Sequence, residues 1–401
     1  MDSITQIYRI GYGPSSSHTM GPSRAARIFR QKTADAASYR VTLYGSLAAT
    51  GKGHLTDKAI ITMLGPLQVE FIWEPSTRLQ RHPNALRFEA INANGKSTTD
   101  WTVYSIGGGA ITDEAGWLTS DSRKIYPLTT MSEILEWCEE NGRTFWEYVQ
   151  MHEPPETFDH LQQVWEIMQE AVKRGIENEG VIPGELKLAR KASSYFIKAQ
   201  SLKDSLKSRS LVFAYALAVS EENASGGMVV TSPTCGSSGV LPAVLYHAKY
   251  AHGFTDSKII KALATAGLIG NIVKEHASIS GAEVGCQGEI GTACAMASGA
   301  VNQLFGGSPQ QIEYAAEMGL EHHLGLTCDP VGGLVQVPCI ERNAHAAARA
   351  LDCNMFALLS DGTHFVSFDK IVQTMRETGN DLPSLYKETA EGGLARFATK
   401  R

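Results

Sequence analysis

The pattern of apolar residues changes near residue 150, and this change constrains the fold of the 401-residue chain more than any other feature. Before it, alternating or β-rich runs predict strands at 39–47, 67–73, 86–92 and 100–106. Helical patterns lie between them at 22–31 and 56–63. Strands mixed with helices predict a small α/β domain in this first part of the chain.

The second part of the chain is predicted to be mostly helical. Apolar residues recur at helical spacing from Phe158 to Val172, which indicates one face of an amphipathic helix. Runs rich in Ala and Gly at 261–270 and 291–300 are apolar nearly all round, yet too short to span a membrane, so we expect closely packed central helices. Two successive prolines between the parts predict a stiff linker.

We therefore expect an α+β protein. A sandwich-like α/β domain would occupy residues 1–150, a linker 151–157, and a mostly all-α domain 158–401. A chain of this length is too long for one ordinary core, which agrees with more than one domain.

The charge pattern excludes two classes of partner. The chain has 36 basic and 42 acidic residues, a net charge of −6, and no run of five or more like charges. Nucleic acid and membrane surfaces are therefore not expected as partners, and a small-molecule substrate is. The N-terminus lacks the pattern of a signal peptide, so we expect a cytoplasmic protein. The commonest oligomer of soluble proteins, a homodimer, is the expected assembly.

Cysteines give the strongest indication of chemistry. The chain has 7, an odd number, and a disulfide framework is not expected in the cytoplasm. Cys286, Cys328 and Cys339 lie in loops dense with Gly and Pro, whose turns can direct thiolates to one point. Their spacings of 42 and 11 residues match no zinc finger or zinc ribbon. Three converging thiolates without a fourth predict an iron–sulfur cluster with one iron open to substrate.

Two polar loops come directly before predicted helices. The loop from Gly13 to Pro22 places hydroxyl and imidazole side chains between two Gly-Pro pairs. Such a loop can offer hydroxyls, backbone N–H groups and a helix N-terminus to an anion, or it can be a helix start capped by Ser or Thr. The loop 231–239, rich in Gly and Ser, precedes a helical run and can bind a carboxylate in the same way. Cys235 within it is either a nucleophile or an inert thiol.

A third loop, 45–54, has two glycines around Lys52 but lacks the spacing of a phosphate-binding loop. His54 at its end is a candidate acid or base, because imidazole exchanges protons near neutral pH. The alternative is a structural histidine at a helix start.

Taken together, these motifs resemble the iron–sulfur-dependent L-serine dehydratases, or L-serine ammonia-lyases, in the single-chain form that fuses a β-type domain to an α-type catalytic domain. The resemblance extends over nearly the whole chain, and it is carried by the segments 14–22, 51–54, 178–184, 232–239, the loop around Cys286, 325–333 and 338–343. It implies that Cys286, Cys328 and Cys339 bind a [4Fe–4S] cluster. It also implies that the first domain supplies His18 and His54 to the active site.

The implied reaction removes water from L-serine and yields pyruvate and ammonia. The open iron would polarise the hydroxyl group, His54 would take the α-proton, and His18 would position the substrate. We expect the carboxylate of the substrate to be held by residues of the first two loops, namely Ser15, Ser16, Ser17, Thr19, Ser232, Thr234, Gly236 and Ser237. The alternatives are an iron–sulfur hydro-lyase that acts on a hydroxy acid, and a metal-binding protein without catalysis.

Two departures from the family pattern are visible. Members of the fused form usually end in a tail with a cysteine that reaches the fourth iron, whereas the segment 392–401 has none. The expected ligand of that iron is then water or hydroxide. The segment between Met63 and His82 is also shorter than is usual in the family.

Overall fold

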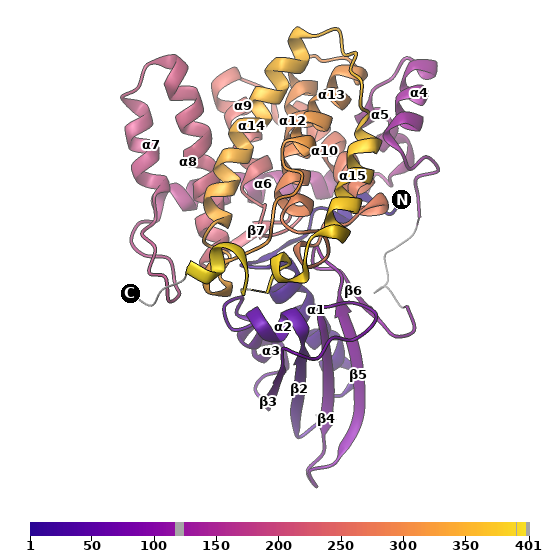
Figure 1. The fold of residues 1–401 in the computed structure, drawn as a ribbon, viewed down its shortest axis with the longest axis vertical. Helices are drawn as coiled ribbons and strands as arrows, with labels where there is room; N and C mark the ends of the chain where they lie inside the picture. The colour runs from indigo at the N-terminus through magenta and orange to yellow at the C-terminus, as the bar shows by residue number, and fades with distance from the viewer. Residues whose placement is uncertain (117–123, 390, 398–401) are drawn as a thin grey trace.

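The structure, a computed structural model, describes residues 1–116, 124–389 and 391–397. Figure 1 shows a sheet with its own helices at one end of the molecule and a bundle of helices at the other. The predicted α+β fold, an α/β part followed by a largely helical part, is thus confirmed. Among the described residues, no helix has both the length and the apolar character that a bilayer crossing needs.

The sheet has five strands in the order β3-β2-β4-β5-β6. β2 pairs with β3 in parallel, and the other pairs are antiparallel. The bounds are β2 Ser38–Tyr44, β3 Gln68–Glu74, β4 Ala85–Ile91, β5 Ser97–Ser105 and β6 Ile111–Asp113. The four predicted strands overlap β2 to β5, and only the three-residue β6 was not predicted.

Three helices accompany this sheet: α1 Gly21–Lys32, α2 Gly45–Thr50 and α3 Thr56–Leu64. Phe29 of α1 stacks on Phe88 of β4 with ring centroids 5.3 Å apart, and on Trp101 of β5 at 6.4 Å. Burial of these aromatic rings holds α1 against the sheet. The position of α1 matters for the site, because the turn that carries His18 leads directly into it.

The helical part surrounds one nearly buried helix. Every residue of α12 (Thr292–Leu304) except Gln303 is buried. A Cβ built on Gly319 of the neighbouring α13 would lie 2.9 Å from the backbone of Ala295, so the two helices approach too closely for a side chain there. The other helices are α4 Met131–Asn141, α5 Phe145–His152, α6 Glu156–Glu177, α7 Ala192–Gln200, α8 Asp204–Ala224, α9 Val240–His252, α10 Asp256–His276, α11 Gly281–Val284, α13 Pro309–Glu321, α14 Cys339–Leu359 and α15 Phe368–Asp381.

The first residues of the chain pack within the helical part. β1 (Ile10–Tyr12) pairs antiparallel with β7 (Met228–Val230), and Ile4 and Tyr8 belong to the helical core. The buried Glu153 carboxylate, between α5 and α6, accepts a hydrogen bond of 2.7 Å from the Ile4 N–H. The limits of the domains at 150 and 158 stay a prediction. The chain crosses between the two parts more than once, and Figure 1 shows its yellow C-terminal segment at their boundary.

Candidate active site

The three predicted cysteines lie close together. Cys286 precedes the short helical turn Gln287–Gly291, Cys328 follows α13, and Cys339 begins α14. Burial raises the pKa of the Cys286 thiol to about 12. Burial also raises the pKa of Cys328, to which Glu388, Glu289, Cys286 and Cys339 add, and the pKa of Cys339, to which Cys286 adds. Thiols that influence one another in this way must be near neighbours, because screening weakens more distant charges.

A guanidinium group accompanies the thiols. Arg342, on α14, donates a hydrogen bond of 2.7 Å to the Thr327 carbonyl and one of 3.2 Å to Asp329 Oδ1. Burial alone would lower the pKa of Arg342, but negative charge on Cys286 and Cys339 raises it overall. Sequence reasoning did not select this residue, although it lies in the 338–343 segment. Its fixed positive charge favours thiolate over thiol.

The two predicted histidines also meet. His18 lies in the turn Ser16–Met20, His54 lies between α2 and α3, and both are buried. Their ring centroids are 4.4 Å apart. Burial lowers the pKa of His54 to about 3, and burial together with the nearby His54 holds the pKa of His18 well below 6.5. Both imidazoles are therefore neutral at pH 7, and a neutral imidazole can accept a proton.

Hydrogen bonds engage both ring nitrogens of His18. Nδ1 lies 2.9 Å from Ser17 Oγ and 3.4 Å from Glu388 Oε1, while Nε2 lies 3.0 Å from Ser46 Oγ. His54 differs, since its Nδ1 lies 3.1 Å from Thr50 Oγ1 and its Nε2 has no hydrogen-bond partner within the described part of the chain. His18 is thus held in place, whereas one nitrogen of His54 is available.

Glu388 connects the histidines to the cysteines. Its N–H donates a hydrogen bond of 2.8 Å to the Cys328 carbonyl, and its own carbonyl accepts one of 2.9 Å from Ser46 Oγ. The residue has a φ of 58°, a left-handed conformation that is uncommon for a side chain other than Gly. Burial raises the pKa of its carboxyl well above the ordinary value. The shifts of Glu388 and His18 both favour uncharged forms, so the two groups meet as neutral neighbours, 3.4 Å apart.

Sequence reasoning missed Glu388 because no pattern near it distinguishes it, and its contacts come from other segments, Cys328 in the helical part and His18 and Ser46 near the start of the chain. The ligand atoms of His18, His54 and Glu388 all lie within 4.8 Å of one another. Two imidazoles and a carboxylate at this spacing can share protons or hold a metal ion.

A second carboxyl group, that of Glu289, lies between the Gly- and Ser-rich loop and the cysteines. Its Oε1 accepts a hydrogen bond of 2.7 Å from Thr234 Oγ1. A Cβ built on Gly281 would lie 2.7 Å from Glu289 Oε2 and 3.1 Å from Cys328 Sγ. Glu289 is therefore next to Cys328, and only a glycine fits between them. Burial raises the pKa of its carboxyl. Sequence reasoning missed this residue as well, although it is three positions after Cys286.

Some hydroxyls of the first loop already form hydrogen bonds with the protein. Ser15 Oγ accepts a hydrogen bond of 3.0 Å from the His18 N–H and caps the turn, and Thr19 Oγ1 donates one of 2.7 Å to the His54 carbonyl. Ser16 and Ser17 are buried beside them. Capping, one of the two interpretations of this loop, is therefore present at Ser15. The Thr19 bond, by contrast, holds the two histidine segments together.

Hydrogen bonds also hold the shape of the loop 231–239. Ser237 Oγ donates a hydrogen bond of 3.2 Å to the Ser232 carbonyl, and the Gly236 carbonyl accepts one of 2.7 Å from Asn343 Nδ2. The Ser232 hydroxyl, by contrast, is buried without a partner in the described part of the chain. Cys235 Sγ lies 3.7 Å from Met20 Sδ, so this loop and the first one are adjacent.

The predicted residues therefore gather from both parts of the fold. A Cβ on Gly53 would lie 2.6 Å from the Gly333 carbonyl, which places the His54 segment directly on the turn between Cys328 and Cys339. Thiols, imidazoles, carboxyls and hydroxyls thus surround one small region at the boundary between the sheet and the helices. Such a region can bind a metal centre and move a proton beside it.

Comparisons with known proteins agree with this arrangement. The sequence profile of the serine dehydratase beta chain matches residues 3–70, and that of the serine dehydratase alpha chain matches residues 84–395. The chain is 42% identical over 446 aligned positions to the L-serine dehydratase of Streptomyces coelicolor, with 98% of each chain covered. It is 40% identical over 449 positions to L-serine dehydratase 2 of Escherichia coli, again with 98% of each covered. The Helicobacter pylori L-serine dehydratase is 36% identical, with 98% of each covered.

The low pKa of His54 predicts a pH dependence of stability. Between the ordinary pKa near 6.5 and about 3, the unfolded chain binds a proton at this residue that the folded chain does not. Folding stability should therefore fall as the pH drops below 6.5, by up to about 1.4 kcal/mol per pH unit from this group. Urea unfolding between pH 7.5 and pH 5 measures the effect. A His54→Asn variant should show a flatter profile, and an identical slope in both proteins would contradict the prediction.

Proposed function

Since the chain belongs to the L-serine dehydratase family, we propose that it is a lyase that eliminates water from L-serine and releases pyruvate and ammonia. The observation that supports this most directly is the meeting of Cys286, Cys328 and Cys339 with His18 and His54. Serine has a poor leaving group and a weakly acidic α-hydrogen, so its dehydration needs both a Lewis acid and a base.

The cysteines suit an iron–sulfur cluster, and we propose that they bind a [4Fe–4S] cluster. Three free sulfur donors, of which Cys286 and Cys328 are buried and Cys339 is half-buried, form a soft ligand set, and Arg342 beside them offsets part of the negative charge of the thiolates. When bound, such a cluster would supply a Lewis acid for the serine hydroxyl at the iron that has no cysteine ligand. Metal binding requires thiolates, so the raised pKa values mean that protons leave as the cluster is inserted.

His54 is the proposed base for the α-proton. It is neutral at pH 7, and Thr50 orients its ring through Nδ1, which leaves Nε2 to accept a proton. His18 is the proposed positioning residue. Its contacts to Ser17, Ser46 and Glu388 fix the ring next to His54 and in reach of the substrate.

The two polar loops are proposed to hold the substrate carboxylate. Backbone N–H groups and the unpaired Ser232 hydroxyl are donors fixed before the substrate arrives, which lowers the cost of reorganisation during the reaction. Ser16, Ser17, Thr234, Gly236 and Ser237 belong to the same proposed surface. Ser15 and Thr19 contribute by holding the shape of the first loop.

We further propose that the protein is cytoplasmic and forms a homodimer. A cytoplasmic protein keeps its thiols reduced, as cluster binding requires. A homodimer is the proposed oligomeric state.

Replacement of a cluster ligand should remove both the metal and the activity. Cys328→Ser is expected to lose most of its iron and all measurable turnover, because a serine oxygen is a poorer ligand for iron in this type of site. The measurement is iron and acid-labile sulfide per chain in protein purified without oxygen. Cys138→Ala, a change of a buried cysteine on α4, is the matched control and should keep its iron. A Cys328→Ser protein with full iron content and turnover would refute the proposed ligand.

Loss of the proposed base should reduce turnover and spare the cluster. His54→Ala should lower kcat for L-serine by about 10² to 10⁴, the usual contribution of a positioned proton acceptor. Exchange of the α-deuterium of labelled serine should fall with it, while the iron content stays unchanged. His252→Ala, at the exposed end of α9, controls for loss of a histidine. Undiminished α-deuterium exchange in His54→Ala would assign the base to another group.

Glu388 should act through His18 and not through its charge. Glu388→Ala is expected to lower kcat by about 10-fold to 100-fold, the scale of a residue that orients a reacting group. Glu388→Gln should restore most of the loss, because the contact to His18 is between neutral groups and an amide can still form it. Equal losses in both variants would show that the carboxyl group itself takes part. Pyruvate formation at saturating L-serine measures both.

A further inference from the structure

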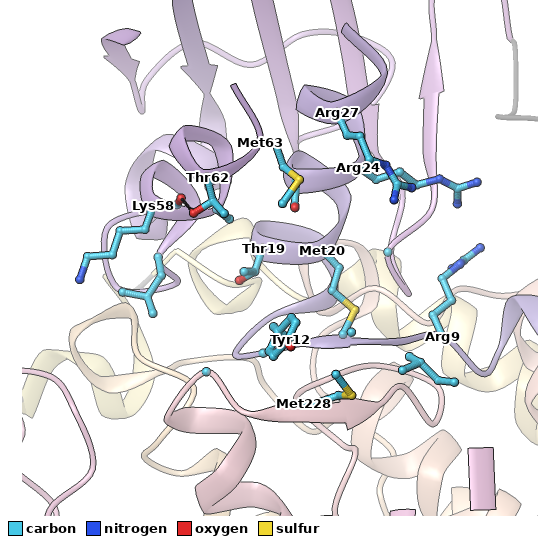
Figure 2. A pocket seen from close by; sticks show the side chains of 18 of the residues that line it. Arg9, Tyr12, Thr19, Met20, Arg24, Arg27, Lys58, Thr62, Met63 and Met228 are labelled. Atoms are coloured by element: carbon cyan, nitrogen blue, oxygen red, sulfur yellow. Dashed lines mark hydrogen bonds between the residues drawn. The ribbon is translucent and has the colours of Figure 1, made fainter. Parts of the chain in front are cut away.

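A large cavity lies beside the candidate active site, with which it shares Thr19, where the sheet part meets the helical part. Its volume is about 960 Å³, and its walls come from β1, α1, α3 and β7. Figure 2 shows the side chains of Met20, Met63 and Met228 directed into its middle. The proposed reaction uses none of these residues. We call this space the interdomain cavity.

The charges that line the interdomain cavity have one sign. Arg9, Arg24, Arg27 and Lys58 line it, and none of the described lining residues is an aspartate or a glutamate. In Figure 2 the three arginines lie along one side, and Lys58 lies on the opposite side. The whole chain has a net charge of −6, so a lining of this kind departs strongly from the average surface. A concave surface with charges of one sign concentrates counter-ions.

Two of these cations are available to a ligand. The side chains of Arg27 and Lys58 are exposed and form no hydrogen bond or ion pair with any residue in 1–116, 124–389 or 391–397. Arg9 is held in place, because its guanidinium donates to the Gly108 carbonyl and to Gln6 Oε1. A ligand would thus meet one fixed guanidinium and two side chains that can close on it.

The cavity is connected to both catalytic histidines. α1 carries Arg24 and Arg27 and begins directly after the turn of His18, whereas α3 carries Lys58 in its first turn and begins two residues after His54. Thr19, which also lines the cavity, donates a hydrogen bond of 2.7 Å to the His54 carbonyl. A ligand that draws α1 and α3 together would therefore act on the two histidine segments.

We propose that the interdomain cavity is an effector site for a small organic anion with at least two negative groups, either phosphate or carboxylate. The anionic groups pair with the arginines and with Lys58, and the methionines contact the organic body of the ligand. Binding at this site changes the turnover of L-serine through α1 and α3. That second statement rests on the proposed function, whereas binding of the anion does not.

Calorimetric titration of the anaerobically purified protein tests binding, with citrate and inorganic phosphate as the probes and ionic strength held constant. At least one probe should bind saturably. The double variant Arg27→Gln/Lys58→Gln should bind it at least about tenfold more weakly, because two charge-assisted contacts are lost. The double variant Lys96→Gln/Lys173→Gln removes the same charge from exposed positions outside the cavity and should bind as the unchanged protein does.

Tighter binding of citrate would identify a carboxylate ligand, and tighter binding of inorganic phosphate would identify a phosphate ligand. Absence of saturable binding by both probes, or equal weakening in both double variants, would overturn the site. A saturating probe should also shift KM or kcat for L-serine in the unchanged protein and not in Arg27→Gln/Lys58→Gln. Binding without that shift would overturn the effector role. A protein that binds the probe but never turns over L-serine would keep the site and refute the proposed function.

Discussion

The structure depends on the removal of many titratable groups from water at a single boundary. Three thiols, two imidazoles, a guanidinium and two carboxyls lie between the sheet part and the helices, where an unpaired charge is costly. Burial keeps the imidazoles and the two carboxyls uncharged, and hydrogen bonds from neighbouring segments satisfy several of these groups. His18 bonds Ser17 and Ser46, and Arg342 bonds Thr327 and Asp329. The same lack of water shifts the pKa values towards neutral imidazole and neutral carboxyl, the forms from which proton transfer can begin.

Most of the fold was accessible from the sequence because it depends on local periodicity. Strands β2 to β5 and helix α6 have long alternating or helical patterns, and the predictions overlap each of them. β1, β6 and β7 have three residues each, too few for any pattern, and β1 pairs with a strand more than 200 positions away. The position of the first residues inside the helical core follows from that pairing and from contacts of Ile4 and Tyr8, which no local pattern indicates.

The candidate site, like the fold, could be predicted only in part from the sequence. Cysteine and histidine in glycine-rich loops are unusual enough to be selected from the sequence, and the structure brings the three cysteines near His18 and His54. Glu289, Arg342 and Glu388 are common residue types, and their importance comes only from neighbours supplied by other segments. Glu388 meets Ser46 across 342 positions of sequence. Ser15 shows why the loop of the first histidine had two interpretations, because a hydroxyl that caps a turn and one that meets an anion have the same local sequence.

The pairing of β1 with β7 also sets an order for assembly during synthesis. At translation rates of about 5 to 20 residues per second, β7 would leave the ribosome on the order of 10 to 40 seconds after β1. The sheet part, with α1 and its aromatic core, can form during that interval. β1, which precedes the turn of His18, stays without its strand partner until the interval ends, and the contact from Glu388 arrives only when the chain is almost complete. A nascent or truncated chain would thus expose the unpaired edge of β1 and an unfinished arrangement of cysteines and histidines.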